Sequence, residues 1–193
     1  AVAGLRALAG ITGATVVNTV GAKGLLRWDD PLHGGTAGLQ EGDVDLCELS
    51  SADLVVTTGL ERRDSASLAA ALERRRAHDP DAAVDVHPAH LALAAGGWPP
   101  ADGPGARPPL YERIAAVVGP LYDAGGWPRP APAAAAALAR DLPPGGLVVA
   151  PPGPVGFWVG RTLPTTEPRS VVVPAGDSPG TAAAVAVLAA RAG

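Results

Sequence analysis

Five short apolar runs, separated by segments of helical character, constrain the fold most strongly. They cover residues 14–20, 52–58, 82–86, 146–150 and 170–173. Each run is rich in valine, threonine or alanine and too short for a typical helix, so we interpret the runs as buried strands. Strands that alternate with helices in this way form parallel sheets joined by right-handed crossovers. The pattern therefore predicts an α/β fold.

The segments between these runs predict helices and irregular connections. The expected helices cover residues 5–11, 44–49, 67–76, 110–122, 133–141 and 181–191. Ser65 or Ser67 is available to cap the third of them. We expect irregular structure at 28–36 and 151–156, and glycine- and proline-rich linkers at 91–109 and 125–132. This organisation predicts a domain over 1–109, a helix and linker over 110–132, and the first part of a second α/β domain over 133–193.

Composition narrows the functional class. Aromatic residues make up only 4% of the chain and hydrophobic residues 47%, so the core must consist of alanine, valine and leucine. With a net charge of −4 and no basic stripe, an extended nucleic-acid surface is not expected. The sequence has no signal peptide and no apolar run of about 20 residues, so we expect a cytoplasmic protein without a membrane span. Because the chain lacks methionine and ends in an alanine-rich helix, we also expect both ends to continue in a longer polypeptide, with the first strand of the first domain before residue 1.

Three motifs in order resemble the central domain of thiamine diphosphate enzymes, nearest to the acetolactate synthase and 2-oxo acid decarboxylase group. They are Thr19-Val-Gly-Ala-Lys-Gly24, Asp30-Pro-Leu-His-Gly-Gly-Thr-Ala-Gly38 and Ser51-Ala-Asp-Leu-Val-Val-Thr-Thr-Gly59. Residues 83–88 lie where the family has a strand carrying Asp-x-Asp-Pro. Residues 142–158 resemble the opening of the diphosphate-binding domain, and 176–190 its glycine-rich turn and helix. The resemblance implies a Rossmann-like central domain followed by a truncated second α/β domain.

The same resemblance implies the chemistry of the intact protein. Such enzymes decarboxylate or join 2-oxo acids, using thiamine diphosphate as an electron sink and Mg²⁺ to hold its diphosphate. Family members rely on an activating glutamate in a preceding domain and on a Gly-Asp-Gly…Asn metal motif, and neither maps onto this sequence. Gly176-Asp177-Ser178 is only superficially similar to that motif. We therefore assign no catalytic residue and no metal ligand, and expect residues 1–193 alone to be inactive. Relatives are dimers or tetramers, so a homo-oligomer is expected.

Five candidate binding residues lie at the ends of predicted strands in the central domain: Gly21, Lys23, Gly24, Gly59 and Asp85. Loops at the carboxyl ends of parallel strands present amides to phosphates, and some relatives bind FAD or ADP there. Here the usual Gly-Ala-Arg-Phe-Asp loop is replaced by residues 59–64, and His87 replaces the second acid of Asp-x-Asp. These changes favour a structural role over FAD binding. Lys23 either contacts a phosphate or is simply solvated.

The loop over residues 151–156 supplies the last two candidates, Gly153 and Gly156. Glycine lets a backbone amide approach a phosphate closely. Three prolines in the same loop remove three N–H donors, however, so a rigid surface loop is the alternative.

The remaining reactive side chains have simpler interpretations. His33, His87 and His90 lie in separate segments and do not form a metal-binding pattern. Cys47 lies in an apolar stripe, which indicates a buried thiol rather than a nucleophile. Phe157 and Trp158 are expected to pack the second domain, and residues 73–76 to form a charged helix face.

Two functional hypotheses remain open. In the first, the chain is part of an acetolactate synthase-like enzyme. In the second, it belongs to a degenerate homologue that keeps the fold as a nucleotide-binding or assembly module. The altered segments at 59–64, 85–87 and 151–156 favour the second hypothesis, whereas the ordered motifs favour the first.

Overall fold

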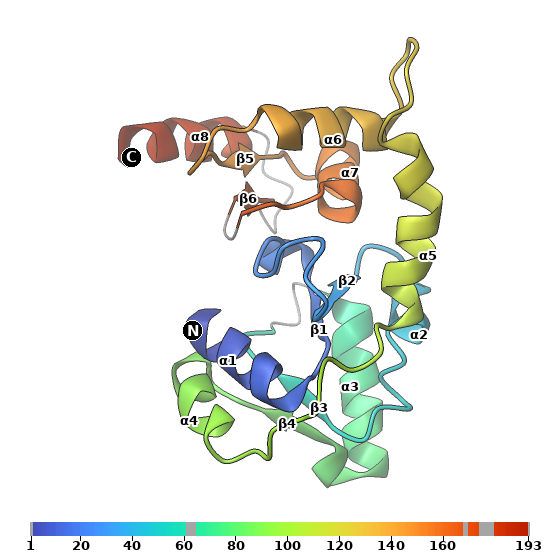
Figure 1. Ribbon diagram of the computed structural model, residues 1–193, viewed down its shortest axis with the longest axis vertical. Helices are drawn as coiled ribbons and strands as arrows, with labels where there is room; N and C mark the ends of the chain where they lie inside the picture. Colours follow the sequence, from blue (N-terminus) through green and yellow to red (C-terminus); the bar gives the residue numbers. More distant parts are fainter. Residues whose placement is uncertain (1, 61–64, 168–169, 174–179, 193) are drawn as a thin grey trace. The chain divides into compact units, whose positions relative to one another are not determined.

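The computed structural model describes residues 2–60, 65–167, 170–173 and 180–192, and it has the mixed α/β character that the sequence predicts (Figure 1). The strands are β1 (Val16–Asn18), β2 (His33–Thr36), β3 (Val55–Thr57), β4 (Ala83–Asp85), β5 (Val148–Val149) and β6 (Val171–Val172). The α-helices are α1 (Val2–Thr12), α2 (Asp43–Leu46), α3 (Ala66–His78), α4 (Leu91–Ala95), α5 (Pro109–Val118), α6 (Ala131–Asp141), α7 (Pro154–Thr162) and α8 (Thr181–Ala192). Short 3₁₀ turns are η1 (Val20–Ala22), η2 (Pro80–Ala82), η3 (Pro88–His90) and η4 (Gly119–Leu121).

The strands pair in parallel, as their alternation with helices predicts. β1 pairs with β2, β3 with β4 and β5 with β6. The β3–β4 register sets Val55 opposite Ala83 and Thr57 opposite Asp85. Within the described residues these pairs form three two-stranded sheets rather than one continuous sheet. The structure thus shows a mixed α/β fold with parallel strand pairs.

The chain divides into two compact units. Unit 1 consists of residues 1–19 and 31–111, and unit 2 of residues 20–30 and 112–193. The segment 20–30, which links β1 to β2, therefore groups with the C-terminal half of the chain. The expected boundaries at 109 and 132 remain a prediction, and nothing in that prediction anticipates the assignment of 20–30 to unit 2.

Close packing of α1 on α4 builds part of the core of unit 1. The two helices lie side by side, with Leu8 of α1 and Leu91 and Ala95 of α4 buried in one cluster (Figure 1). Gly4 permits this approach, because a Cβ at that position would lie 2.8 Å from the backbone nitrogen of Ala92. Helix α3, which also belongs to unit 1, is capped by Ser65, the residue directly before it. The Ser65 hydroxyl accepts a hydrogen bond from the Leu68 amide in the first turn of the helix.

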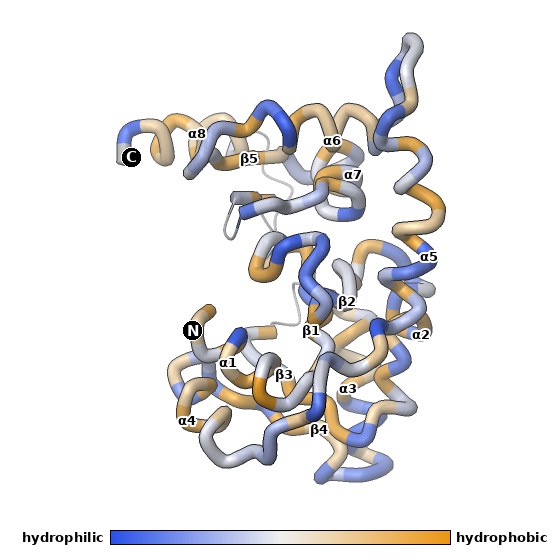
Figure 2. The backbone as a smooth tube through the Cα atoms, in the orientation of Figure 1, coloured by the Kyte–Doolittle hydropathy of each residue, from blue (hydrophilic) through white to orange (hydrophobic). Residues whose placement is uncertain are grey.

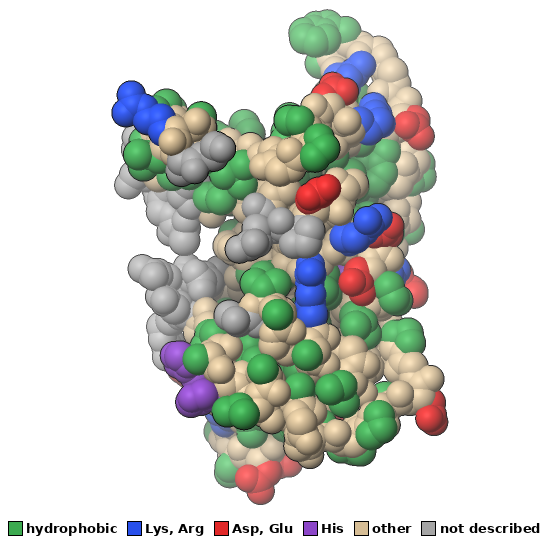
Figure 3. Space-filling model, turned by 60° about the vertical axis from the view of Figure 1, so that its left-hand side comes forward, with side chains coloured by type: hydrophobic (Ala, Val, Ile, Leu, Met, Phe, Trp, Pro, Cys, Tyr) green, Lys and Arg blue, Asp and Glu red, His purple; other side chains and the backbone are tan. Residues whose placement is uncertain are grey.

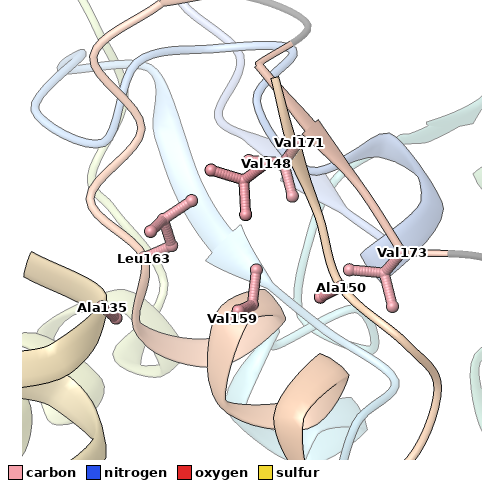
Figure 4. Packing of buried hydrophobic residues seen from close by; sticks show 7 residues of the cluster. All are labelled: Ala135, Val148, Ala150, Val159, Leu163, Val171 and Val173. Carbon is pink, nitrogen blue, oxygen red and sulfur yellow. The ribbon is translucent and has the colours of Figure 1, made fainter. Parts of the chain in front are cut away.

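Aliphatic side chains from β5, β6 and α7 form the core of unit 2. Figure 4 shows Val148, Val159 and Leu163 pointing toward the centre of this cluster. Ala135 and other small residues of α6 complete it, and Figure 2 shows the hydrophobic character of α6 and α8. Burial of small and β-branched side chains fits a chain so poor in aromatic residues.

Three elements correct the sequence prediction. The expected irregular segment 28–36 contains β2, the expected linker 91–109 begins with α4, and the expected loop 151–156 runs into α7. Gly34 in β2 is buried so tightly that a Cβ would lie 2.7 Å from the Thr15 methyl group. The strand is thus specified by packing against β1 rather than by its own weak strand propensity. Pro154 occupies the first turn of α7, where proline is favoured because its missing N–H has no helical partner.

Two further observations concern membrane-spanning helices and the distribution of charge on the surface. No helix among the described residues is long and apolar enough to cross a bilayer. On the face shown in Figure 3, positive and negative side chains are interspersed among apolar ones.

Candidate functional site

A shallow polar depression lies at the carboxyl ends of β3 and β4 in unit 1. Its volume is about 200 Å³. The lining residues come from β3, β4, α3 and the residue after Gly59, and they are Thr57, Leu60, Ala69, Leu72, Glu73, Arg76 and Asp85. Parallel strands present their carboxyl ends at one edge, which is where α/β proteins bind ligands. Asp85, a candidate binding residue predicted from the sequence, thus lines this depression.

Hydrogen bonds organise this depression around Thr57. Because Thr57 and Asp85 are register partners, the Thr57 hydroxyl lies 2.9 Å from Asp85 Oδ1 and donates to it. Arg76 Nη2 donates to the same hydroxyl oxygen at 3.3 Å, and Arg76 Nε donates to the Ala83 carbonyl at 3.3 Å. The buried threonine therefore connects an exposed carboxylate to a half-buried guanidinium. The arrangement offers an acceptor for ligand hydroxyls and a cation for ligand anions within one small volume.

The neighbouring Arg75 has a structural role. Its guanidinium donates to the carbonyls of Ala82, Leu49 and Ser50 at 3.0, 2.7 and 2.9 Å, and also to the carbonyl of Ala52. The fork of donors on arginine is suited to collecting several acceptors of this kind. In the expected charged helix face over 73–76, Glu73 and Arg74 are exposed, whereas Arg75 and Arg76 bind neighbouring elements.

Gly59 lies two residues after β3 and adopts the left-handed conformation, with φ of +60°. Among the described residues, a Cβ at this position would meet only Pro88 Cγ within 4 Å, at 3.7 Å. The glycine therefore serves the turn that follows the strand. The remainder of the predicted 59–64 loop, from residue 61, lies outside the described residues.

The other predicted residues of the glycine loop belong to unit 2. Lys23 is only 3% exposed, so the interpretation of a solvated loop lysine is wrong. Its Nζ lies 4.6 Å from the centroid of the Trp28 ring and has no hydrogen-bond partner in the part of the chain that the structure describes. Gly24 is buried with φ of +84°, whereas Gly21 is exposed, and a Cβ there would meet none of the described residues within 4 Å.

Burial strongly perturbs the Lys23 ammonium group. Desolvation, reinforced by the like charge of Arg161, lowers the pKa of Lys23 from 10.5 to about 7. Arg161 lies in the last turn of α7 and is 4% exposed. Two basic side chains are therefore buried near one another, an arrangement that is unfavourable while both are charged.

Gly153 and Gly156 lie at the opposite end of α7 and have different surroundings. Gly153 is the exposed N-cap, with φ of +92°, and no atom of the described residues lies within 4 Å of a Cβ there. Gly156 is buried, and a Cβ there would lie 2.4 Å from the Pro151 carbonyl oxygen and 2.9 Å from Val173 Cγ1. Packing of α7 against Pro151 and Val173 therefore accounts for Gly156, whereas Gly153 remains open to solvent.

Histidine and cysteine residues contribute no further site among the described residues. His33 is buried and lies 3.2 Å from Asn18 Oδ1, and its ring packs edge-on against Tyr111. The His87 side chain accepts a hydrogen bond from the Ala89 amide at 3.3 Å. Cys47 is buried, as its apolar stripe predicts. No three residues of the described His, Cys, Asp and Glu set converge as metal ligands, and Gly176–Ser178 lie outside the described residues.

Sequence reasoning missed Thr57, Arg76 and Arg161. Thr57 becomes identifiable only from its register with Asp85, and Arg76 only from its position on α3 opposite the strand ends. The predicted strand over 52–58 includes Thr57 but does not distinguish it from its neighbours. Arg161 lacked any signal, because α7 itself was expected to begin as a loop.

Comparison with models of protein families and with curated proteins finds no match to this chain.

Proposed function

We propose that the chain is part of a thiamine diphosphate-dependent enzyme of the acetolactate synthase-like class, which decarboxylates or joins 2-oxo acids. Unit 1 would correspond to the Rossmann-like central domain and most of unit 2 to the start of the diphosphate-binding domain. By the same resemblance, the enzyme is a cytoplasmic homo-oligomer, either a dimer or a tetramer. Residues 1–193 alone do not carry out the reaction.

The observation that best supports this proposal is where the three ordered motifs fall. The first motif follows β1, the second contains β2, and the third contains β3 and ends at Gly59. All three strands have parallel partners. These positions are the ones that the resemblance implies for the three motifs, which support the proposal only as far as motif matches can.

The described residues do not themselves fit the cofactor. In the family, thiamine diphosphate needs a metal motif and an activating glutamate that do not map onto this sequence. Gly153 exposes the start of α7, but proline occupies the next position, and glycine as the N-cap has no side chain to cap the helix. Gly156 faces protein rather than open space. We therefore assign no reaction step to residues of this chain.

The test uses both the product of the complete gene and residues 1–193. With thiamine diphosphate and Mg²⁺ added, the complete protein should release CO₂ from 2-oxo acids such as pyruvate, whereas residues 1–193 should release none. Sequencing the gene on both sides should reveal an upstream activating glutamate and a downstream Gly-Asp-Gly…Asn motif. Decarboxylation by residues 1–193 alone, or a complete gene lacking both motifs, would contradict the proposal.

The depression at β3 and β4 favours a second candidate function, that of a nucleotide-binding module. An exposed carboxylate at a strand end accepts hydrogen bonds from ribose hydroxyls, and Arg76 offers a cation for a phosphate. The volume of about 200 Å³ is below the range of about 300–1,000 Å³ that encloses drug-sized ligands. It therefore suits part of a nucleotide better than a whole FAD.

Titration of residues 1–193 with ADP, followed by calorimetry, tests this candidate. Asp85→Asn and Arg76→Gln should each weaken ADP binding about tenfold or more, because each loses a charge-assisted hydrogen bond. Asp45→Asn is the matched control, since Asp45 is exposed on α2 and outside the depression. Equal affinity of all four proteins, or no binding by the parent, would eliminate the nucleotide module.

A further inference from the structure

Lys23 is the only lysine in the chain, while its other fourteen strongly basic residues are arginine. Arginine stays charged at all physiological pH values, whereas lysine can lose its proton and become a nucleophile. A sequence that uses arginine everywhere else has lysine at a position where the side chain is 3% exposed. The chemical difference between the two residues therefore matters most at position 23.

The surroundings of Lys23 favour its neutral amine. Within the described residues its Nζ has no hydrogen-bond partner, and the nearby charge that acts on it is the like charge of Arg161. The nearby acids of the same segment, Asp29 and Asp30, act on Arg27 instead, and the Asp29 carboxylate accepts two hydrogen bonds from Arg27 at 2.9 Å. A desolvated lysine beside a second cation is the environment in which proteins generate an amine nucleophile.

We propose that the Lys23 amine takes up carbon dioxide and forms a carbamate that the Arg161 guanidinium stabilises. The Nζ lone pair attacks the carbon of CO₂, an N–C bond forms, and one C–O π bond breaks as its electron pair moves to oxygen. The nitrogen releases one proton to solvent, so no oxidant or reductant is needed. The product places a carboxylate-like group beside Arg161, whose planar fork of donors matches such a group.

Carbamate formation removes the repulsion between the buried charges of Lys23 and Arg161. Two cations become an anion and a cation, and the added oxygens supply the acceptors that Nζ lacks. Carbon dioxide is a small reagent, and the product adds only three atoms to the side chain. The ring of Trp28, which covers Nζ at 4.6 Å, is itself half-buried and therefore lies at the edge of this site. This inference is independent of thiamine diphosphate and of the proposed 2-oxo acid reaction.

Incubation of residues 1–193 with ¹³C-bicarbonate at about pH 8 tests the proposal, because the amine is mostly neutral there. Carbon NMR should show a protein carbamate signal, and trapping with a trialkyloxonium reagent followed by peptide mass spectrometry should locate it on Lys23. The matched control is Lys23→Arg, which keeps a long basic side chain at this position but cannot form the carbamate. The N-terminal amine, the only other amine in the chain, is the same in both proteins.

Arg161→Gln tests the stabilising partner and should weaken CO₂ uptake about tenfold or more, through loss of a charge-assisted contact. Circular dichroism of each variant establishes that it is folded. Should the Arg161 variant fail to fold, the comparison of the parent with Lys23→Arg still decides the question. An equal carbamate signal in these two proteins, or phosphate binding at Lys23 without any carbamate, would overturn the proposal.

Discussion

Lys23 and Arg75 are both basic, but the hydrogen-bond acceptors around their side chains differ. Arg75 places its guanidinium among the carbonyls of Ala82, Leu49 and Ser50, so its charge is well solvated by the protein. Lys23 is buried without such acceptors in the described part of the chain. One residue therefore ties elements together, while the other carries an unfavourable charge that folding must accommodate.

The lowered pKa of Lys23 predicts a characteristic pH dependence of stability. Folding lowers this pKa from 10.5 to about 7, so between these values the unfolded chain binds the proton that the folded chain releases. The free energy of unfolding should therefore rise with pH through that window, by up to about 1.4 kcal/mol per pH unit. Below about pH 7 Lys23 is protonated in both states, so the full cost of burying its charge lowers the free energy of unfolding there.

Urea denaturation at several pH values in bicarbonate-free buffer measures this effect. Lys23→Met removes the titrating group and should reduce the pH slope, with its largest stability gain below about pH 7. Parallel pH profiles for the parent and this variant would show that Lys23 retains an ordinary pKa in the folded protein.

At the scale of elements, the sequence predicts strands by their composition but cannot predict elements that depend on their neighbours. The valine-rich strands β1, β3 and β5 fall within their predicted runs. β2 contains two glycines, and its strand conformation follows from pairing with β1 and from burial. α7 escaped prediction because prolines indicate loops in most contexts, although proline also starts helices.

The same distinction applies to the candidate site. Asp85 and Gly59 are predictable because strand ends and glycine turns have local signals. Thr57 and Arg76 complete the site through strand register and helix position, which are properties of the folded chain. The lowered pKa of Lys23 was unpredictable for a related reason, since one of its causes is the charge of Arg161, which is far away in the sequence.

Two glycines of α1 provide a matched test of helix packing. Gly4→Ala should destabilise the protein by about 1–3 kcal/mol, because the new Cβ would lie 2.8 Å from the Ala92 nitrogen at the contact with α4. Gly10→Ala adds the same methyl group where no atom of the described part of the chain, apart from the helix's own backbone and chain neighbours, lies within 4 Å. It should stabilise the helix by about 0.5–1 kcal/mol. Urea denaturation compares the two, and an equal gain from both would mean that α1 and α4 are not closely packed.

At the scale of the whole molecule, the two units should respond separately to core mutations. Leu26 is 3% exposed in the segment 20–30 of unit 2, whereas Leu91 is 1% exposed in unit 1. Each change to alanine should cost about 2–5 kcal/mol locally.

Hydrogen exchange detected by mass spectrometry resolves where this loss occurs. Leu26→Ala should accelerate exchange mainly in β5, β6 and α7, and Leu91→Ala mainly in α1 and β4. An equal increase throughout the chain for both variants would mean that the protein unfolds as a single cooperative block.

The grouping of residues 20–30 with unit 2 has a consequence during synthesis. The Thr165 hydroxyl donates to the Leu26 carbonyl across a sequence separation of 139 residues. Residues 20–30 therefore leave the ribosome long before the strands and helices that will cover them. Until then Leu26 and Lys23 remain in water, and Lys23 keeps its proton. Such distant pairing slows folding and prolongs the exposure of apolar segments. The pKa of Lys23 would thus fall toward about 7 only when the C-terminal half of the chain is made.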